Sequence, residues 1–307
     1  MLVPLLSSRR VTDRSASART GLAGLVLGAR RRVSRVRAVS LRAGRFHVPA
    51  LVGGPEHDRR PLVLLHGFSD TKDSFVDVAR ALTRTRRVVL PDLPGFAEAS
   101  QPVDHRYTIA SIAKVLVEAL RELAPEGVHL VGNSLGGAVA AYVGLEHPQW
   151  VRSLTLIGAA GVRMPVPSAM QRHIEAGHNP FVVRGEDEFP AFMRFVVERV
   201  PAMPSAVMRA MARDFAARRA MNEKILAELV EDGLDLTERL REIEVPTLLL
   251  WGDRDRLIDV SAGRAYHEAI PHARLVVMHG IGHCPQVEAP RATARRILET
   301  VAAGDHG

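Results

Sequence analysis

The stretch HLVGNSLGGAVA, residues 129–140, holds a serine between glycines where an apolar run meets a run of small residues. Residues 132–136 match the pattern G-x-S-x-G, which by itself is a weak signal because glycine is common and the pattern recurs by chance. The context is stronger. A serine on a sharp strand-to-helix turn needs strained backbone angles, and the close approach of strand and helix admits only glycine two positions to either side. The stretch therefore predicts that Ser134 is an exposed nucleophile, supported by Gly132, Asn133 and Gly136, rather than an ordinary turn hydroxyl.

Short apolar runs alternate with helical patterns from about residue 33 onward. The runs do not alternate with polar residues, as is typical of strands buried on both faces of a parallel sheet. They are PLVLL (61–65), RVVLP (87–91), VHLV (128–131), SLTLI (153–157), PTLLLW (246–251) and RLVVM (274–278). Residues 33–51 predict two further strands, and residues 108–123, 134–147 and 261–270 predict helices, with Thr108 and Ser261 as N-caps. This alternation predicts an α/β protein with a mostly parallel, doubly wound sheet.

The rhythm breaks between residues 162 and 244, which are helical in character, rich in proline and without a clear strand. We predict a core of residues 33–161 and 245–307, with residues 162–244 as a helical cap inserted before the strand at 246–251. Seven of the nine methionines fall in this cap: Met164, Met170, Met193, Met203, Met208, Met211 and Met221. Methionine suits surfaces that accept varied apolar shapes. The alternative is that these side chains only fill a small helical core.

Basic residues gather at the start of the chain. Residues 1–50 hold eleven Arg and one acid, Asp13, so they carry a formal charge of +10, whereas the rest has 30 basic and 33 acidic residues, or −3. The protein has 38 Arg and only three Lys, whereas phosphate-binding surfaces generally use both, so we predict no nucleic-acid partner. Residues 1–32 are predicted to form a poorly ordered, Arg-rich leader. Peripheral contact with an anionic membrane surface, or a twin-arginine secretion signal at Arg9-Arg10, are the alternatives.

One cysteine, Cys284, excludes an internal disulfide and fits a reducing compartment. No run reaches the roughly 18–20 apolar residues that span a bilayer, and the early run GLAGLVLG (21–28) is too short. We therefore predict a cytoplasmic protein, with membrane association left open. The histidines show no HExxH spacing and there is no cysteine cluster, so neither a metal site nor a cofactor is predicted.

A serine becomes nucleophilic only when a base removes its proton, so a histidine and an orienting acid are required. In sites of this kind they follow the serine, acid first, on loops at strand ends. The run 246–251 leads into Gly252-Asp253-Arg254-Asp255, and the last run leads into His279-Gly280-Ile281-Gly282-His283. The residues alone leave Asp253 or Asp255 as the acid and His279 or His283 as the base.

An acyl-transfer site also needs two backbone N–H groups to bind an oxyanion. One is the residue after the nucleophile, Leu135. The other is expected on the loop after an early strand, where His66-Gly67-Phe68 follows residues 61–65, so the N–H of Phe68 is the candidate. The side chain of His66 is expected only to brace this loop.

The order of HGFSD, PDLPG, GNSLGG, WGDRD and GHCPQVEAP resembles the α/β-hydrolase superfamily over roughly residues 45–300. The segments HGFSDTKDSF (66–75), GNSLGG (132–137), IGAAGV (157–162) and NEKIL (222–226) are similar to its lipases and monoacylglycerol lipases. The resemblance implies that Asp255 is the acid and His283 the base. It also implies an acyl-enzyme mechanism, in which water finally releases the acid. The sequence departs from the family at Ala97, where glycine is common, and at Cys284, where an aromatic residue is common.

The predicted activity is hydrolysis of carboxylic esters with lipid-like or medium-chain acyl groups, including monoacylglycerols. A serine at position 134 excludes haloalkane dehalogenases and epoxide hydrolases, which need aspartate there. The alternatives are a C–C bond hydrolase of ring-cleavage products, an acyltransferase or cofactor-free haloperoxidase, and a ligand-binding receptor on the same fold. The chain lacks the glycine-rich extension after His66-Gly67 and the tryptophan after His283 that many C–C bond hydrolases carry. Cys284 is expected to be a small apolar filler, with a reactive thiol as the alternative.

Overall fold

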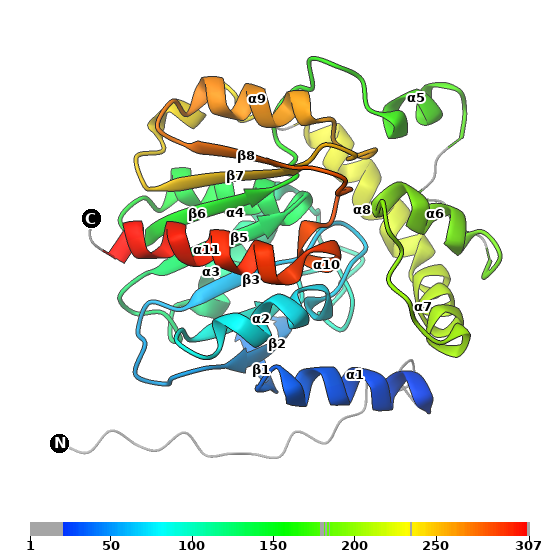
Figure 1. The fold of residues 1–307 in the computed structure, drawn as a ribbon, viewed down its shortest axis with the longest axis horizontal. Helices are drawn as coiled ribbons and strands as arrows, with labels where there is room; N and C mark the ends of the chain where they lie inside the picture. Colours follow the sequence, from blue (N-terminus) through cyan, green and yellow to red (C-terminus); the bar gives the residue numbers. More distant parts are fainter. Residues whose placement is uncertain (1–20, 179–180, 182, 184, 234, 306–307) are drawn as a thin grey trace.

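The computed structural model describes residues 21–178, 181, 183, 185–233 and 235–305 of the 307-residue chain. An eight-stranded sheet lies at its centre, in the order β1-β2-β4-β3-β5-β6-β7-β8 (Figure 1). The strands are β1 (Val36–Ala43), β2 (Phe46–Gly53), β3 (Leu62–Leu65), β4 (Val88–Pro91), β5 (Val128–Asn133), β6 (Val151–Ile157), β7 (Thr247–Gly252) and β8 (Arg274–Met278). Strand β2 runs antiparallel to β1 and β4, and all other neighbours are parallel. The predicted mostly parallel sheet is confirmed.

Both faces of the sheet are covered by helices, which explains why its strands are apolar throughout. In β3, Leu62 and Leu64 pack into one hydrophobic cluster with α2 (Val76–Leu82) and α11 (Pro290–Asp305). Val63 and Leu65 point to the opposite face and pack against helices on that side. Those helices are α3 (Ile109–Leu120), α4 (Leu135–Glu146) and α9 (Val260–Ala269). Burying each such side chain contributes about 1.5–3 kcal/mol, so the two layers fix which face every strand residue occupies.

The helix starts follow from capping side chains. The side chain of Thr108 accepts a hydrogen bond from the Ser111 N–H, and the Ser111 hydroxyl accepts one from the Thr108 N–H. Helix α3 therefore begins with a capping box at its predicted N-cap. The prediction of Ser261 as the N-cap of the later helix is wrong. Asp259 caps α9, because its carboxylate accepts the Ser261 N–H at 2.9 Å and the helix starts at Val260.

Among the described residues between β6 and β7, four α-helices stand over the carboxyl end of the sheet, at the right of Figure 1. They are α5 (Ala169–Glu175), α6 (Phe189–Val196), α7 (Ser205–Ala217) and α8 (Arg219–Asp232). The predicted helical insertion before the strand at 246–251 is present. Its own small core is built on phenylalanine: the rings of Phe192 and Phe215 lie 4.7 Å apart between centroids. The methionines divide, since Met193 and Met208 pack in this cap core while Met164 and Met221 pack on the main core.

The end of the predicted leader differs from the expectation of poor order. Residues 1–20 lie outside the described residues, but Leu22–Val33 form helix α1. Arg30 pairs with Asp77 at 2.9 Å and Arg31 with Asp73 at 2.7 Å, and these ion pairs hold α1 against the start of α2 and the turn just before it. Contacts with distant residues therefore order a segment whose sequence pattern is too short to predict a stable helix. Among the described residues, no helix combines the length and the apolar character that crossing a membrane would need.

Candidate active site

Ser134 lies at the junction of β5 and α4, in a backbone conformation that ordinary residues avoid. Its φ is 56° and its ψ is −117°, a left-handed, strained combination for a residue with a side chain. A Cβ on Gly132 would overlap the carbonyl oxygen of Gly136, and a Cβ on Gly136 would overlap that of Leu65. The two glycines of G-x-S-x-G are therefore required by close backbone approach, as the sequence predicts. The turn leaves the Ser134 side chain at the carboxyl end of the sheet, partly accessible.

Asp255 and His283 meet on two loops that leave neighbouring strands. The Nδ1–H of His283 donates to Asp255 Oδ2 at 2.7 Å, and both side chains are almost fully buried. The other oxygen of Asp255 accepts the N–H groups of Leu257 and Ile258, each at 2.9 Å. With its proton on Nδ1, the imidazole keeps the lone pair on Nε2 free, which is the state a general base needs.

Ser134 and His283 line one cavity, but among the described residues no hydrogen bond joins them. The Nε2 atom of His283 is buried and has no hydrogen-bond partner within the described part of the chain. The lone pair of His283 Nε2 is therefore available to the Ser134 hydroxyl. Hydrogen bonds between a catalytic serine and histidine often shorten only when substrate binds.

The loop after β3 presents the candidate oxyanion donors. His66 is fully buried: its Nδ1 contacts the Gly67 carbonyl at 2.8 Å and its Nε2 accepts the Leu93 N–H at 2.9 Å. Burial lowers the pKa of His66, so the neutral ring braces this loop against the loop after β4. A Cβ on Gly67 would come within 3.2 Å of Ser134 Cβ, so the loop runs directly past Ser134. Within the described residues, the N–H groups of Phe68 and Leu135 donate to no other group.

A buried ion pair fixes the far end of this loop. Lys72 Nζ lies 2.5 Å from Asp92 Oδ2 and 2.8 Å from Glu98 Oε2, and the Lys72 N–H donates to Asp92 Oδ1 at 2.9 Å. Lys72 and Asp92 are both almost completely buried. Such a pair specifies geometry more than it adds stability, because desolvating the charges offsets their attraction.

Three contacts near Ser134 are not predicted by the sequence, because they join residues far apart in the chain. Asn133 donates to the carbonyls of Ile157 and His283 and accepts from Gln286 at 3.0 Å. These bonds connect the turn at Ser134 to the loop that carries His283. A Cβ on Gly158 would come within 3.0 Å of His283 Nδ1. Asn222, in α8, donates to Ser69 Oγ at 2.7 Å and so connects the cap to the loop of Phe68. The segments IGAAGV and NEKIL contain Gly158 and Asn222, and were the only signal for them.

Asp253 and His279, the other acid and histidine of the two loops, pair with each other. His279 Nδ1 lies 2.6 Å from Asp253 Oδ2, and 89% of the His279 side chain is exposed. Neither residue lines the cavity that contains Ser134. The two pairs therefore differ in their surroundings: Asp253 and His279 lie at the surface, whereas Asp255 and His283 are buried and His283 lines the cavity.

A second Ser-His-Asp set shows that hydrogen bonding alone does not identify the site. His129 Nδ1 lies 2.9 Å from Ser153 Oγ, and its Nε2 lies 3.2 Å from Asp305 Oδ1. Ser153 and His129 are buried near the opposite end of the strands from Ser134, and neither lines the cavity. Burial lowers the pKa of His129 to about 4, so it is neutral at pH 7 and acts as a structural hydrogen-bonding group.

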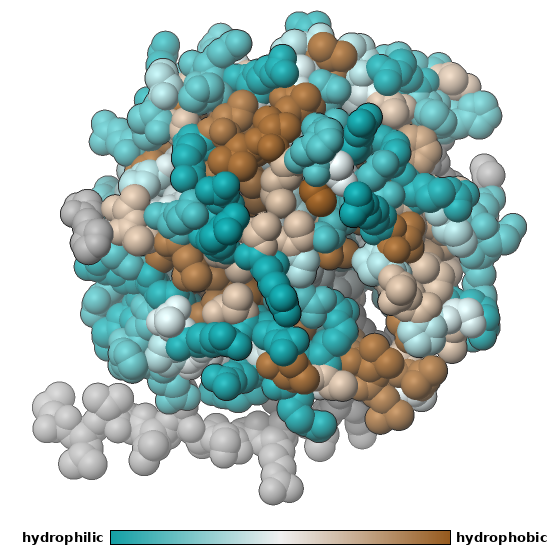
Figure 2. Space-filling view, viewed as in Figure 1, coloured by the Kyte–Doolittle hydropathy of each residue, from teal (hydrophilic) through white to brown (hydrophobic). Residues whose placement is uncertain are grey.

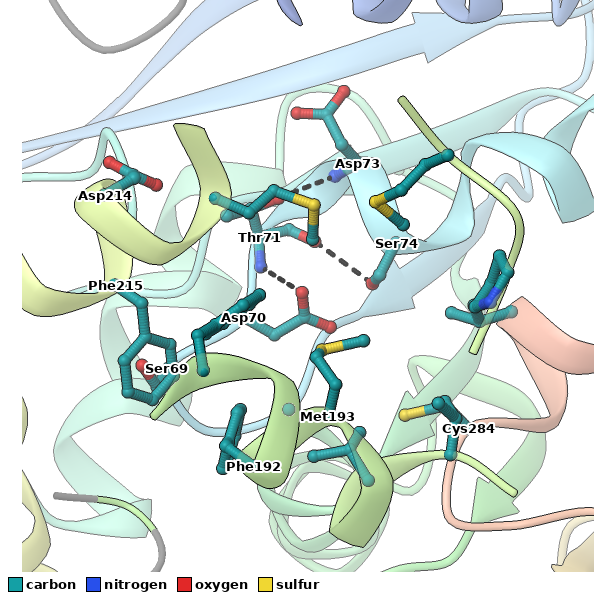
Figure 3. A pocket seen from close by; sticks show the side chains of 18 of the residues that line it. Ser69, Asp70, Thr71, Asp73, Ser74, Phe192, Met193, Asp214, Phe215 and Cys284 are labelled. Carbon is teal, nitrogen blue, oxygen red and sulfur yellow. Dashed lines mark hydrogen bonds between the residues drawn. The ribbon is translucent and has the colours of Figure 1, made fainter. Parts of the chain in front are cut away.

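A cavity of about 460 Å³ opens above Ser134 between the core and the cap (Figure 3). This is the size of a typical small-molecule site. Most of its wall is apolar, with phenylalanines from the cap, and three of the seven cap methionines line it: Met193, Met203 and Met211. Four residues of α1 also line it: Ala23, Val26, Leu27 and Arg30.

The two departures from the family pattern have structural explanations. Ala97 has a φ of 51°, a conformation that glycine adopts without strain, which explains why glycine is common there. Cys284 is buried among apolar cap residues, and burial raises the pKa of its thiol well above the usual value. A thiol of this kind packs as a small apolar group and is a poor nucleophile.

A serine at a strained strand-to-helix turn, beside a buried histidine–aspartate pair, defines a class of hydrolases, and comparison with known proteins agrees. The family model for the alpha/beta hydrolase fold matches residues 60–290. The chain therefore belongs to the α/β-hydrolase family, as the sequence predicted.

Individual relatives add detail. Lipase 1 of Psychrobacter immobilis is 31% identical over 248 residues, which cover 78% of each chain. The monoacylglycerol lipase abhd6-B of Xenopus laevis is 25% identical over 257 residues, which cover 80% of this chain and 76% of the relative. A crystal structure described as a membrane phospholipase A, a novel bacterial virulence factor, is 34% identical with a TM-score of 0.90, and covers 93% of this chain and 92% of its own.

Proposed function

We propose that this protein hydrolyses carboxylic esters of lipid-like or medium-chain acids through an acyl-enzyme formed on Ser134. The lipase relatives, at 31% identity over most of the chain, bear out the prediction of a carboxylic-ester hydrolase. The observation that carries the finer proposal is that Ser134 and His283 both open on one largely apolar cavity. An acyl chain buries apolar area in such a cavity while its ester carbonyl reaches the serine.

The proposed mechanism assigns one task to each group. His283 Nε2 takes the Ser134 proton as Oγ attacks the carbonyl carbon, and Asp255 stabilises the imidazolium that forms. The N–H groups of Phe68 and Leu135 bind the developing oxyanion, aided by the amino end of α4. His283 then protonates the leaving alcohol. A water molecule activated by the same histidine attacks the acyl-enzyme and releases the acid.

Hydrolysis of a p-nitrophenyl ester series from acetyl to palmitoyl tests this proposal. We expect kcat/KM to rise with chain length and to reach its maximum at medium or long chains, because each buried methylene adds about 0.8 kcal/mol of binding until the cavity is full. A maximum at acetyl would contradict an apolar acyl site. No ester turnover by the folded protein would instead favour a C–C bond hydrolase of ring-cleavage products or a ligand-binding receptor.

We also propose that α1 brings the cavity to an anionic membrane surface. Leu22 is 50% exposed and Leu25 is 72% exposed, whereas Ala23 and Val26 of the same helix line the cavity. Figure 2 shows hydrophobic surface at the lower right, where Figure 1 places α1 and the tip of α7. Three arginines, Arg30 to Arg32, follow in the last turn, and two of them, Arg30 and Arg31, also hold the helix to aspartates of the core. Exposed leucines beside basic residues are typical of helices that lie in the membrane interface.

Pelleting with vesicles that contain anionic lipid tests this contact. We expect the double variant Leu22→Glu/Leu25→Glu to pellet several-fold less than the unmodified protein, because two carboxylates replace the inserted apolar groups and face like charge. The matched control is Val103→Glu, since Val103 is equally apolar, 74% exposed and lies in the loop before α3. Equal pelleting of the three proteins would rule out α1 as the contact.

A further inference from the structure

One carboxyl group in the wall of the cavity has no counter-charge. Four aspartates among the described residues line the cavity: Asp70, Asp73, Asp77 and Asp214. Three of them are neutralised by an arginine, at 2.7 Å for Asp73, 2.9 Å for Asp77 and 2.6 Å for Asp214. No described basic side chain forms an ion pair with Asp70.

The carboxyl of Asp70 is only half satisfied by the protein. Its Oδ1 accepts the Thr71 N–H at 2.7 Å, and the other described donor beside the carboxyl is the Ser74 hydroxyl. Figure 3 shows the carboxyl directed into the pocket, between Thr71 and the cap residue Met193. The Ser74 hydroxyl, on the same turn, donates to the Thr71 carbonyl at 3.1 Å. One oxygen thus holds the turn together and the other faces the cavity.

The environment of Asp70 disfavours the charged form of its carboxyl. Burial raises the pKa of Asp70, against the opposing influence of His66, the Thr71 N–H, Ser74 and Arg218. Arg218, the arginine whose charge acts on Asp70, is engaged by the carbonyl and carboxylate of Asp214 through Nε and Nη2. Asp70 is partly exposed and lines the cavity, so a ligand there can complete its set of hydrogen-bond partners.

The position of Asp70 in the chain places it close to the chemistry. It lies two residues after Phe68, whose N–H is the proposed oxyanion donor, and it lines the same cavity as Ser134. Asn222 and the intervening Ser69 tie this loop to the cap at 2.7 Å, which holds Asp70 in place beneath the cap. A substrate whose carbonyl reaches Ser134 therefore has this carboxyl in the wall of the cavity that it occupies.

We infer that Asp70 is a specificity-determining residue, which accepts a hydrogen bond from a hydroxyl group of the substrate through Oδ2. This inference rests on the proposed ester hydrolysis and narrows it to hydroxyl-bearing esters. The hydroxyl comes either from a polyol leaving group such as glycerol or from a hydroxylated acyl chain. Both supply the donor that Oδ2 lacks, and a phosphate or a free carboxylate in the same place is repelled by Asp70.

Two matched pairs of substrates test the inference and separate the two sources. 1-Decanoylglycerol against propyl decanoate differs only in hydroxyls on the alcohol side. The p-nitrophenyl esters of 12-hydroxydodecanoic and dodecanoic acid differ only in a hydroxyl on the acyl side. We expect the unmodified protein to prefer the hydroxylated member of one pair by roughly 10-fold or more in kcat/KM, because a site built to bind a hydroxyl leaves its acceptor unpaired when the hydroxyl is missing.

Substitutions at Asp70 then test whether its carboxyl causes the preference for the hydroxylated ester. In Asp70→Leu and Asp70→Ala we expect the ratio within that pair to fall to about one while the unhydroxylated ester is still hydrolysed, since only the hydroxyl loses its partner. The two replacements differ in volume, so a loss common to both reports the carboxyl and not the packing. The matched control is Asp77→Asn, because Asp77 lies at the α1 side of the cavity and is already paired with Arg30. It is expected to retain the ratio.

Each outcome has a distinct meaning. A preference that is lost in folded Asp70→Leu or Asp70→Ala supports the inference, and thermal melting verifies that the variant is folded. A ratio unchanged by these substitutions, or turnover of all four esters without preference, overturns the inference and leaves ester hydrolysis standing. No turnover of any of the four esters by the unmodified protein overturns the proposed function, and the inference with it.

Discussion

Replacing Ser134 with alanine is expected to lower kcat for ester hydrolysis by roughly 10⁴- to 10⁶-fold. The variant keeps the cavity and the N–H groups of Phe68 and Leu135, so only the weak catalysis supplied by binding and oxyanion stabilisation remains. The strained φ of 56° at this position is no worse for alanine than for serine, and the fold is expected to persist. Steady-state hydrolysis of the best p-nitrophenyl ester, together with thermal melting, measures both quantities.

The second buried Ser-His-Asp set supplies the control. Ser153 contacts His129 at 2.9 Å and is as well placed by hydrogen bonding as any candidate, but it does not line the cavity. Ser153→Ala is expected to leave kcat within a few-fold and to reduce stability by about 1 kcal/mol through the lost hydrogen bond. If Ser153→Ala abolished activity and Ser134→Ala did not, the assignment of the nucleophile would be wrong.

The Asp255→Asn variant is expected to lower kcat by about 10⁴-fold. An amide in this place satisfies Leu257 and Ile258 with its oxygen and turns its NH₂ group towards His283 Nδ1. Nδ1 then has to accept, which moves the imidazole proton to Nε2 and removes the lone pair that would take the Ser134 proton. The geometry is preserved while the tautomer is inverted, so KM is expected to change far less than kcat.

Asp253→Asn is the matched control for this substitution. Asp253 lies on the same loop and also contacts a histidine, but that histidine, His279, is exposed and away from the cavity. We expect the Asp253→Asn variant to retain kcat within a few-fold, measured with the same ester at pH 7. A larger loss of kcat for Asp253→Asn than for Asp255→Asn would reassign the acid and, with it, the histidine.

Local patterns were sufficient for much of the fold because the forces behind them act over a few residues. The run VHLV predicted β5 because a strand covered on both faces has no polar side to reveal. Thr108 predicted the start of α3 because a capping box needs only four consecutive residues. The same reasoning failed at Ser261, because Asp259, two residues earlier, competes for the same cap with a charged acceptor.

The order of the motifs along the chain predicts the main residues of the candidate site. It does not predict the contacts between residues that lie far apart in the sequence. The loop residues Asp253, Asp255, His279 and His283 are candidates on equal terms until the resemblance to the family separates them. In the structure only His283 lines the cavity, and its partner is Asp255. Gln286 and Asn222 received no functional prediction, because their partners, Asn133 and Ser69, are more than 150 residues away. In the sequence, nothing distinguishes Asp70 from other loop aspartates. In the structure, it differs because the other aspartates that line the cavity are paired with arginines.

The sequence by itself determined the parallel sheet, the sharp turn at Ser134 and the glycines on either side of it, since steric exclusion and side-chain periodicity are local. Only the tertiary structure decided that the end of the Arg-rich segment forms a helix beside the cavity, held by Asp73 and Asp77, and that Asp70 faces the cavity without a counter-charge. Both depend on which distant side chains come within a few ångströms of one another. That choice is made by the packing of the whole chain, because ion pairing and desolvation act through space and not along the sequence.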